Sequence, residues 1–191
     1  MITTFTAVVI IVIMVLFNGF FSMSEMAVVS SRRSKLKMKA DSGHPGYRAV
    51  LETARDPNSF LSGIQVGITL IGILAGAFGE ATVSENMERY FMDVPLLAGY
   101  SKIISIGLVV FMTTSLSIIL GELVPKRVAL TNPERIASLV IFPVRAISYM
   151  LLPLSKFFTA VTDLFMYLLP FKPDVEPPVS EEEIRGMIRE G

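Results

Sequence analysis

Three long apolar blocks limit what this chain can fold into. The first runs from about Thr6 to Ser31 and carries only Glu25 as a charged residue, while Phe60–Gly79 and Ile103–Gly121 carry none. A helix needs about 20 apolar residues to cross a membrane, because each residue adds about 1.5 Å. With 52% hydrophobic and 18% charged residues, the chain is more apolar than an ordinary soluble domain. We therefore predict an all-α integral membrane protein with three transmembrane helices, over about 6–31, 60–79 and 103–122.

The region 135–171 is also apolar, but it is interrupted. Pro143, Pro153 and Pro170 divide it into short runs, and charged side chains such as Arg145 lie between them. Short runs with cations fit helices that lie in the membrane interface and extend their charges to the headgroups. We predict a cytoplasmic-side belt of juxtamembrane helices over 135–171, which completes a transmembrane domain over residues 1–171. A fourth span is the alternative, and it would place the C-terminus outside.

The loops predict the orientation of the spans. Basic residues gather between Arg32 and Lys39 and again from Lys126 to Arg135, whereas the loop between the second and third blocks is acidic. Cytoplasmic loops hold an excess of Lys and Arg near the span ends. We predict a multi-pass protein of the cell membrane, plasma or inner, with its N-terminus outside and its C-terminus in the cytoplasm. The net charge is formally zero, so no global field favours a nucleic-acid partner.

Polar side chains lie inside the first and third blocks, at depths where hydrocarbon is expected. Ser22, Ser24 and Glu25 fall roughly 10–15 Å from the basic flank of the first helix, and Glu122 falls roughly 6 Å from the flank of the third. An ionisable residue in a span costs a few kcal/mol and usually marks a substrate or ion path. A structural charge pair is the alternative, although we expect no cation inside the three spans to neutralise either glutamate. We predict that these side chains line a cation site.

The second block is rich in glycine. Near one face of its helix it carries Gly72, Gly76 and Gly79, a pattern that favours close packing against another helix. Gly67 has a second interpretation, in which its bare carbonyl becomes a ligand beside Thr69, because irregular backbone is tolerated where it lines a cavity. Gly121 can act in the same way. The candidate metal ligands are Ser22, Ser24, Glu25, Gly67, Thr69, Gly121 and Glu122.

These candidates are hard oxygen donors, which suit Mg²⁺ or Ca²⁺. The chain has no cysteine, and its one histidine, His44, lies in a loop with Gly43 and Pro45. Softer metals are therefore disfavoured. The motifs of zinc proteases and of serine hydrolases are absent from the sequence, so we predict that the chain is not an enzyme.

Three segments together resemble the transmembrane module of the CorC, CorB and cyclin M (CNNM) family. They are Phe21–Ala27, Gln65–Ile73 and Gly121–Lys126, and they are followed by Val179–Ile184. The resemblance implies a homodimeric Mg²⁺ exporter or Mg²⁺ homeostasis factor with an inward-facing cavity that holds a dehydrated Mg²⁺. It assigns Ser22 and Glu122 as ligands.

The same resemblance implies Na⁺ as the coupling ion. Many family members carry asparagines where this chain has Ile68 and Gly72, which leaves the ligand from the second helix open. We expect Glu25 to accept a hydrogen bond near the ion or to balance the charge of Na⁺.

The last twenty residues predict a link to another domain. Residues 172–178 form a proline-rich linker, and Ser180 and Glu183 have the spacing of a helix-capping box. In the family such an acidic helix leads into a pair of CBS domains that bind adenine nucleotide, so we expect ATP only on a cytoplasmic domain beyond this chain. One further function stays open: a membrane-anchored Mg²⁺ sensor or scaffold without transport.

Overall fold

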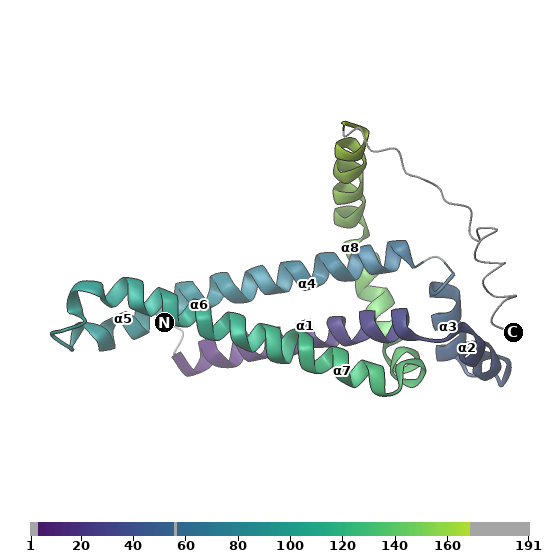
Figure 1. Ribbon diagram of the computed structural model, residues 1–191, viewed down its shortest axis with the longest axis horizontal. Coiled ribbons are helices and arrows are strands. Elements are labelled where there is room, and N and C mark those ends of the chain that lie inside the picture. The colour runs from purple at the N-terminus through teal and green to yellow at the C-terminus, as the bar shows by residue number, and fades with distance from the viewer. Residues whose placement is uncertain (1–3, 56, 169–191) are drawn as a thin grey trace, which may run out of the picture. The chain divides into compact units, whose positions relative to one another are not determined.

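The computed structural model describes residues 4–55 and 57–168, and all regular secondary structure in this part of the chain is helical (Figure 1). The predicted linker and acidic helix, over residues 172–191, lie outside the described residues. In chain order the elements are α1 Thr4–Ser30, α2 Arg33–Asp41, α3 Pro45–Thr53, α4 Asn58–Gly79, η1 Glu80–Ser84, α5 Glu85–Met92, η2 Ala98–Tyr100, α6 Ser101–Ile118, η3 Ile119–Leu123, α7 Val124–Thr131 and α8 Pro133–Leu168. Both η1 and η3 are single π-helical turns, and η2 is a 3₁₀ turn.

Four stretches of helix are long and apolar enough to cross a membrane. They are Thr4–Ser30, Phe60–Met92, Ala98–Thr131 and Pro133–Leu168. The prediction of an all-α membrane protein agrees with this architecture, and the first three stretches contain the three predicted spans except for residue 31. They are longer than predicted, because α4 continues through η1 into α5, and α6 continues through η3 into α7.

The fourth stretch differs from the predicted belt. Where several short helices are expected, the structure has the single helix α8, with Pro143 and Pro153 inside it. Proline removes one backbone hydrogen bond and bends a helix, but membrane helices tolerate it when neighbouring groups satisfy the backbone. The described helices therefore give four candidate spans, and three spans with a belt is not confirmed.

The contacts divide the chain into two units, Met1–Ser155 and Lys156–Gly191. In the described part of the second unit, Phe157 and Phe158 make an edge-to-face ring contact, and the Thr162 hydroxyl donates to the carbonyl of Phe158.

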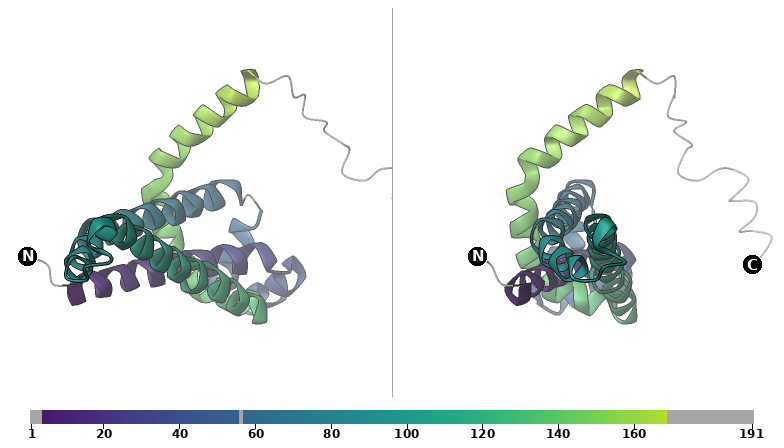
Figure 2. Two further views of the ribbon diagram at one scale, coloured as in Figure 1. Left: turned by 60° about the vertical axis from the view of Figure 1, so that its left-hand side comes forward. Right: turned by 90° about the vertical axis from the view of Figure 1, so that its left-hand side faces the viewer.

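Within the first unit α1 lies between two other helical stretches. It packs against α4 on one side and against η3 and α7 on the other (Figure 1), and Figure 2 shows the same helices turned. The main apolar cluster lies at the C-terminal end of α1, where Phe21, Ile64 and Ile141 are almost fully buried. This cluster joins α1, α4 and the first half of α8, and it fixes the C-terminal part of α1 in place.

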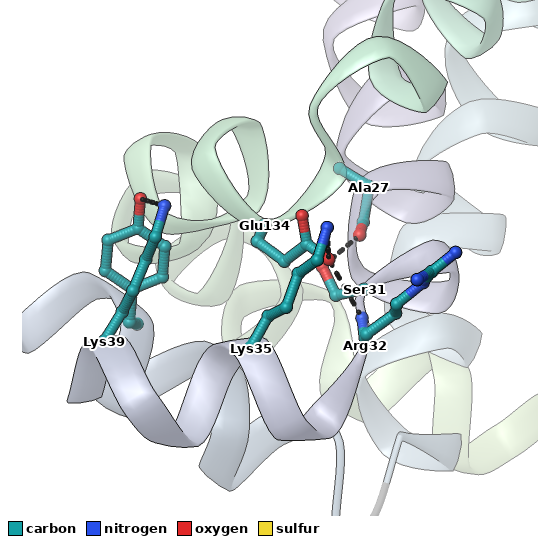
Figure 3. Close-up of polar contacts among 7 residues, drawn as sticks. Ala27, Ser31, Arg32, Lys35, Lys39 and Glu134 are labelled. Carbon is teal, nitrogen blue, oxygen red and sulfur yellow. Dashed lines mark hydrogen bonds and ion pairs between the residues drawn. The ribbon is translucent and has the colours of Figure 1, made fainter. Parts of the chain in front are cut away.

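A buried carboxylate ties α8 to the turn between α1 and α2 (Figure 3). Glu134, in the first turn of α8, is 4% exposed. Its Oε1 accepts a hydrogen bond from the backbone N–H of Arg32 at 3.4 Å and lies 3.8 Å from Nζ of Lys35. A carboxylate is favoured here because it faces the positive end of two helix dipoles. The end of α1 is thereby held against the start of α8.

A second contact joins α2 to α3. Nζ of Lys39 donates to the phenol oxygen of Tyr47 at 3.2 Å (Figure 3). Burial raises the pKa of the Tyr47 phenol, but hydrogen bonds from Lys39 and Ser138 and the charges of Lys39 and Arg135 outweigh it, so the pKa is lowered. The basic loop after α1 is therefore an ordered pair of helices.

The glycines of α4 fall into two groups. A side chain at Gly63 would overlap Ser148 of α8, and one at Gly67 would lie 3.3 Å from Leu151. Gly79 is similarly tight against Thr113. A methyl group added at Gly72 or Gly76, in contrast, would have no described neighbour within 4 Å. Close packing therefore explains Gly79 but not Gly72 or Gly76.

We expect Gly63→Ala to destabilise the protein and Gly76→Ala to leave it as stable or slightly more stable. The added methyl group at 63 overpacks the contact with Ser148, which typically costs about 1–3 kcal/mol. At 76 the methyl group has open space, and alanine favours a helix by about 1 kcal/mol. Thermal unfolding of the two purified variants tests this, and equal melting temperatures would contradict it.

Candidate cation site

A cavity of about 260 Å³ lies between α1, α4 and α6. Its polar wall carries one carboxylate, one amide and three hydroxyls, from Glu122, Asn18, Thr113, Thr114 and Ser117. The bare backbone of Gly72 and Gly76 forms the wall on the α4 side. A hollow with several oxygen groups between membrane helices is the expected setting of a substrate or ion site.

Two buried oxygens on α1 have no hydrogen-bond partner among the described residues. They are Oδ1 of Asn18, whose residue is 8% exposed, and Oγ of Ser22, whose residue is 1% exposed. The two residues are four apart on α1 and so share one face of the helix. An unsatisfied buried oxygen costs about 1–3 kcal/mol, and such groups call for an explanation. A cation that both oxygens help to bind would supply one.

The π-helical turn η3 brings the third helix close to this face of α1. Gly121 is buried there, and a side chain on it would lie 3.2 Å from Nδ2 of Asn18. Gly19 is equally constrained, because its side chain would lie 2.7 Å from the carbonyl oxygen of Leu120. Pro125 has no N–H, so it cannot donate to the carbonyls one turn before it. Single π turns often occur at functional sites, where they re-aim the backbone.

Glu122, at the edge of the cavity, is already paired. Its Oε1 lies 2.7 Å from Nζ of Lys126, and the two side chains are 48% and 33% exposed. The expectation that no cation would neutralise Glu122 within the spans was wrong. The apolar helix runs on to Thr131, which places Lys126 one turn after Glu122 on the same helix face.

The other predicted ligands lie in different surroundings. The Ser24 hydroxyl donates to the carbonyl of Phe20 at 2.6 Å, so it is satisfied within α1. Gly67 is buried against Leu151 and the ring of Phe21, and Thr69 is exposed. The structure shows no hydrogen bond or ion pair of half-buried Glu25 with another described residue.

The structure thus brings together part of the predicted set. Glu122 lines the cavity, Gly121 adjoins Asn18, and Ser22 lies one helical turn from Asn18. Of the predicted ligands only Glu122 is in the described lining, and Ser22, Ser24, Glu25, Gly67, Thr69 and Gly121 are not. Sequence reasoning missed Asn18, Thr114 and Ser117. The available signals were the four-residue spacing of Asn18 and Ser22 and the polar run 113–117, which comes just before Glu122.

The chemistry of the lining favours a cation bound with few fixed charges. No group of three or more His, Cys, Asp or Glu residues that could hold a metal occurs in the described part of the chain. One carboxylate with neutral oxygens can hold a hard cation that keeps part of its water shell, as Mg²⁺ commonly does. The same oxygens can accept hydrogen bonds from an ammonium group. This geometry therefore selects a class of cation and not one ion.

Comparison with known proteins places this architecture among related membrane proteins. The family model described as the cyclin M transmembrane N-terminal domain matches residues 9–191. The UPF0053 protein sll0260 of Synechocystis is 43% identical over 181 residues, which cover 95% of this chain and 40% of the relative. The polyamine export protein of Escherichia coli is 29% identical over 97% of this chain and 41% of its own length. That of Haemophilus influenzae is 27% identical over 98% and 43%. The chain spans about two fifths of the length of these relatives.

Proposed function

This chain belongs to the cyclin M (CNNM) family, and from that premise we propose that it is the membrane domain of a cation transporter that carries Mg²⁺ out of the cell. The family and the relatives named as export proteins suggest a membrane transport role. Those relatives carry transporter or uncharacterised names, not the names of enzymes. We further propose the cell membrane as its location, with a homodimer as the working assembly and a CBS-domain pair as its regulatory partner.

The observation that carries the proposal is the unpartnered amide oxygen of Asn18 in a cavity that Glu122 also lines. Both oxygens belong to the class of ligand that Mg²⁺ prefers. Ser22 places a second unpartnered oxygen on the same face of α1, and the resemblance to the family assigns this serine as a ligand. We propose Asn18, Ser22 and Glu122 as the side chains that hold the cation, with backbone carbonyls at Gly121.

Export requires an energy source. Moving a charge against an inside-negative potential costs about 2.3 kcal/mol per charge per 100 mV, so a divalent cation needs about twice that. A second cation that enters down its own gradient can supply it. We propose Na⁺ for this role, on the basis of the resemblance to the family.

A specific contact favours a second candidate substrate, an organic polycation. The Lys126 ammonium lies 2.7 Å from the Glu122 carboxylate, so this carboxylate already pairs with an alkylammonium group within the protein. Two of the relatives are named polyamine export proteins. A linear diamine would place one ammonium at Glu122 and hydrogen-bond the neutral oxygens with the other.

The test compares two asparagines. In Asn18→Leu we expect Mg²⁺ affinity to fall about tenfold while thermal stability is unchanged or higher, because the substitution removes an unsatisfied buried oxygen. Asn86→Leu is the matched control: Nδ2 of Asn86 donates to the carbonyl of Thr82 at 2.8 Å, so stability should fall and affinity should stay. Calorimetric titration and thermal unfolding of the purified protein measure both. If Asn18→Leu loses stability and keeps its affinity, Asn18 is structural and the site assignment fails.

Flux separates the remaining possibilities. The protein is reconstituted in liposomes, and Mg²⁺ and radiolabelled 1,4-diaminobutane are supplied in turn with and without a Na⁺ gradient. An enclosed Mg²⁺-sensitive dye reports Mg²⁺ entry, and the retained label reports diamine entry. Dye-reported movement that requires Na⁺ supports the main proposal. Diamine flux without Mg²⁺ flux supports the second candidate, and Mg²⁺ binding without any flux would instead indicate a sensor.

A further inference from the structure

A second cavity, of about 330 Å³, lies between α3, the start of α4 and the middle of α8. Its lining includes Glu52, Arg145 and Tyr149 as polar groups and Phe60 and Leu152 as apolar ones. It shares no described lining residue with the cation site. The volume lies at the lower end of the range of small-molecule sites, roughly 300–1,000 Å³, so it fits a headgroup and not a whole lipid.

The position of Arg145 is unusual. It lies in the first half of the apolar helix α8, where a charged side chain is rare and needs a partner. The residue is half-buried at the wall of the cavity, with 31% of its side chain exposed. An arginine in this position indicates a binding site unless neighbouring groups accept its hydrogen bonds and balance its charge.

The contacts of Arg145 with its neighbours are long. Nη1 lies 3.9 Å from Oε2 of Glu52, and Nη2 donates to the phenol oxygen of Tyr149 at 3.4 Å. The guanidinium has five N–H donors, and well-formed pairs with an anion are about 2.7–2.9 Å long. Most of its donor capacity is therefore unused in the described structure.

The described lining of the cavity carries one cation and one carboxylate, Arg145 and Glu52, and Arg48 adds a second cation beside that carboxylate from outside the lining. Glu52 also lies 3.5 Å from Nε of Arg48, so two guanidinium groups share one carboxylate. The cluster of Arg48, Glu52 and Arg145 carries an excess of one positive charge. A singly charged anion would balance it, and guanidinium binds phosphate with two parallel hydrogen bonds.

The location of the cavity indicates which anion. Part of its charged lining comes from α3, which belongs to the basic loop that follows α1. Part of its lining is apolar, and there Phe60 is 7% exposed. Exposed Tyr149 adds an aromatic ring of the kind that is enriched at membrane interfaces. We propose that this cavity binds the phosphodiester of a membrane phospholipid, with Arg145 as its principal ligand and the acyl chains along the exposed apolar side of α8.

The test uses native mass spectrometry of the purified protein with increasing phosphatidylglycerol, and inorganic phosphate as a separate arm. We expect Arg145→Gln to weaken lipid binding about tenfold or more, because a hydrogen bond to a charged group contributes about 1.5–3 kcal/mol and 1.4 kcal/mol is tenfold. Arg127→Gln is the matched control, since Arg127 is exposed on α7 and does not line the cavity. Equal losses in the two variants would mean general attraction to anions and would overturn the proposal.

A third variant excludes misfolding as the cause. Glu52→Gln removes the carboxylate that competes for Arg145, so lipid binding should become about threefold to tenfold tighter. A damaged protein would not bind lipid more tightly. Weaker binding in Glu52→Gln would overturn the proposal, as would inorganic phosphate binding as tightly as the lipid, because the cavity would then be a phosphate site and not a lipid site.

Discussion

Glu122→Gln should lower the affinity of the protein for Mg²⁺ by about 100-fold, or about 2.7 kcal/mol, and should abolish flux in liposomes. Glu122 is the only carboxylate in the described lining of the cavity. Two unit charges 4 Å apart near a protein surface interact by about 4 kcal/mol, and a divalent cation in direct contact interacts more strongly. Glutamine keeps the size of the side chain and one of its oxygens, so the loss of affinity reports the contribution of the negative charge.

The fold should survive this substitution. The Glu122 side chain is 48% exposed, and its pair with Lys126 is of the surface type, which contributes at most about 1 kcal/mol. Glu25→Gln is the matched control, because Glu25 also lies in a candidate span but is not in the described lining of the cavity. Calorimetric titration of both variants is decisive: similar losses of affinity in both would mean that overall charge, and not the cavity, determines binding.

The sequence predicts the course of the helices well because lipid imposes strong rules. Blocks without charges must be helices, and the three predicted spans, except for residue 31, lie within three of the four long apolar helices. Residue depth also follows from the sequence, since the rise per residue is fixed. By that measure Thr69 and Ser22 lie at similar heights, and both were chosen as ligands. Depth does not say which face a residue occupies, and Thr69 is exposed while Ser22 is buried.

The missed residues depend on how the helices meet. The spacing of Asn18 and Ser22 within α1 indicates a shared face, but the contact of Asn18 with Gly121 of η3 depends on how the helices meet. Similarly, Gly72 and Gly76 show the same small-residue spacing as Gly79. Which of these glycines is packed and which lines a cavity depends on the position of α6. Proline at 143 would indicate a helix end in a soluble protein, whereas α8 continues through it.

Lys126→Met should tighten Mg²⁺ binding by about fivefold to tenfold. In the described structure the Lys126 ammonium occupies Oε1 of Glu122, so a cation that uses this carboxylate must displace it. Removing the ammonium removes its ion pair with Glu122, which contributes about 1 kcal/mol, and it also removes the repulsion between the ammonium and the incoming cation. Methionine keeps most of the side-chain length, so the packing of α7 changes little.

Lys126→Arg is the matched control, because it keeps the positive charge at the same turn of the helix and should leave the affinity within about twofold of the original. The double variant Glu122→Gln with Lys126→Met completes a cycle in which the gain from Lys126→Met should vanish, since the gain requires the carboxylate. A gain that persists without Glu122 would mean that Lys126 acts by long-range repulsion alone. Weaker binding in Lys126→Met would show that the lysine holds Glu122 in its binding position, and that the pair is part of the site and not a competitor of the substrate.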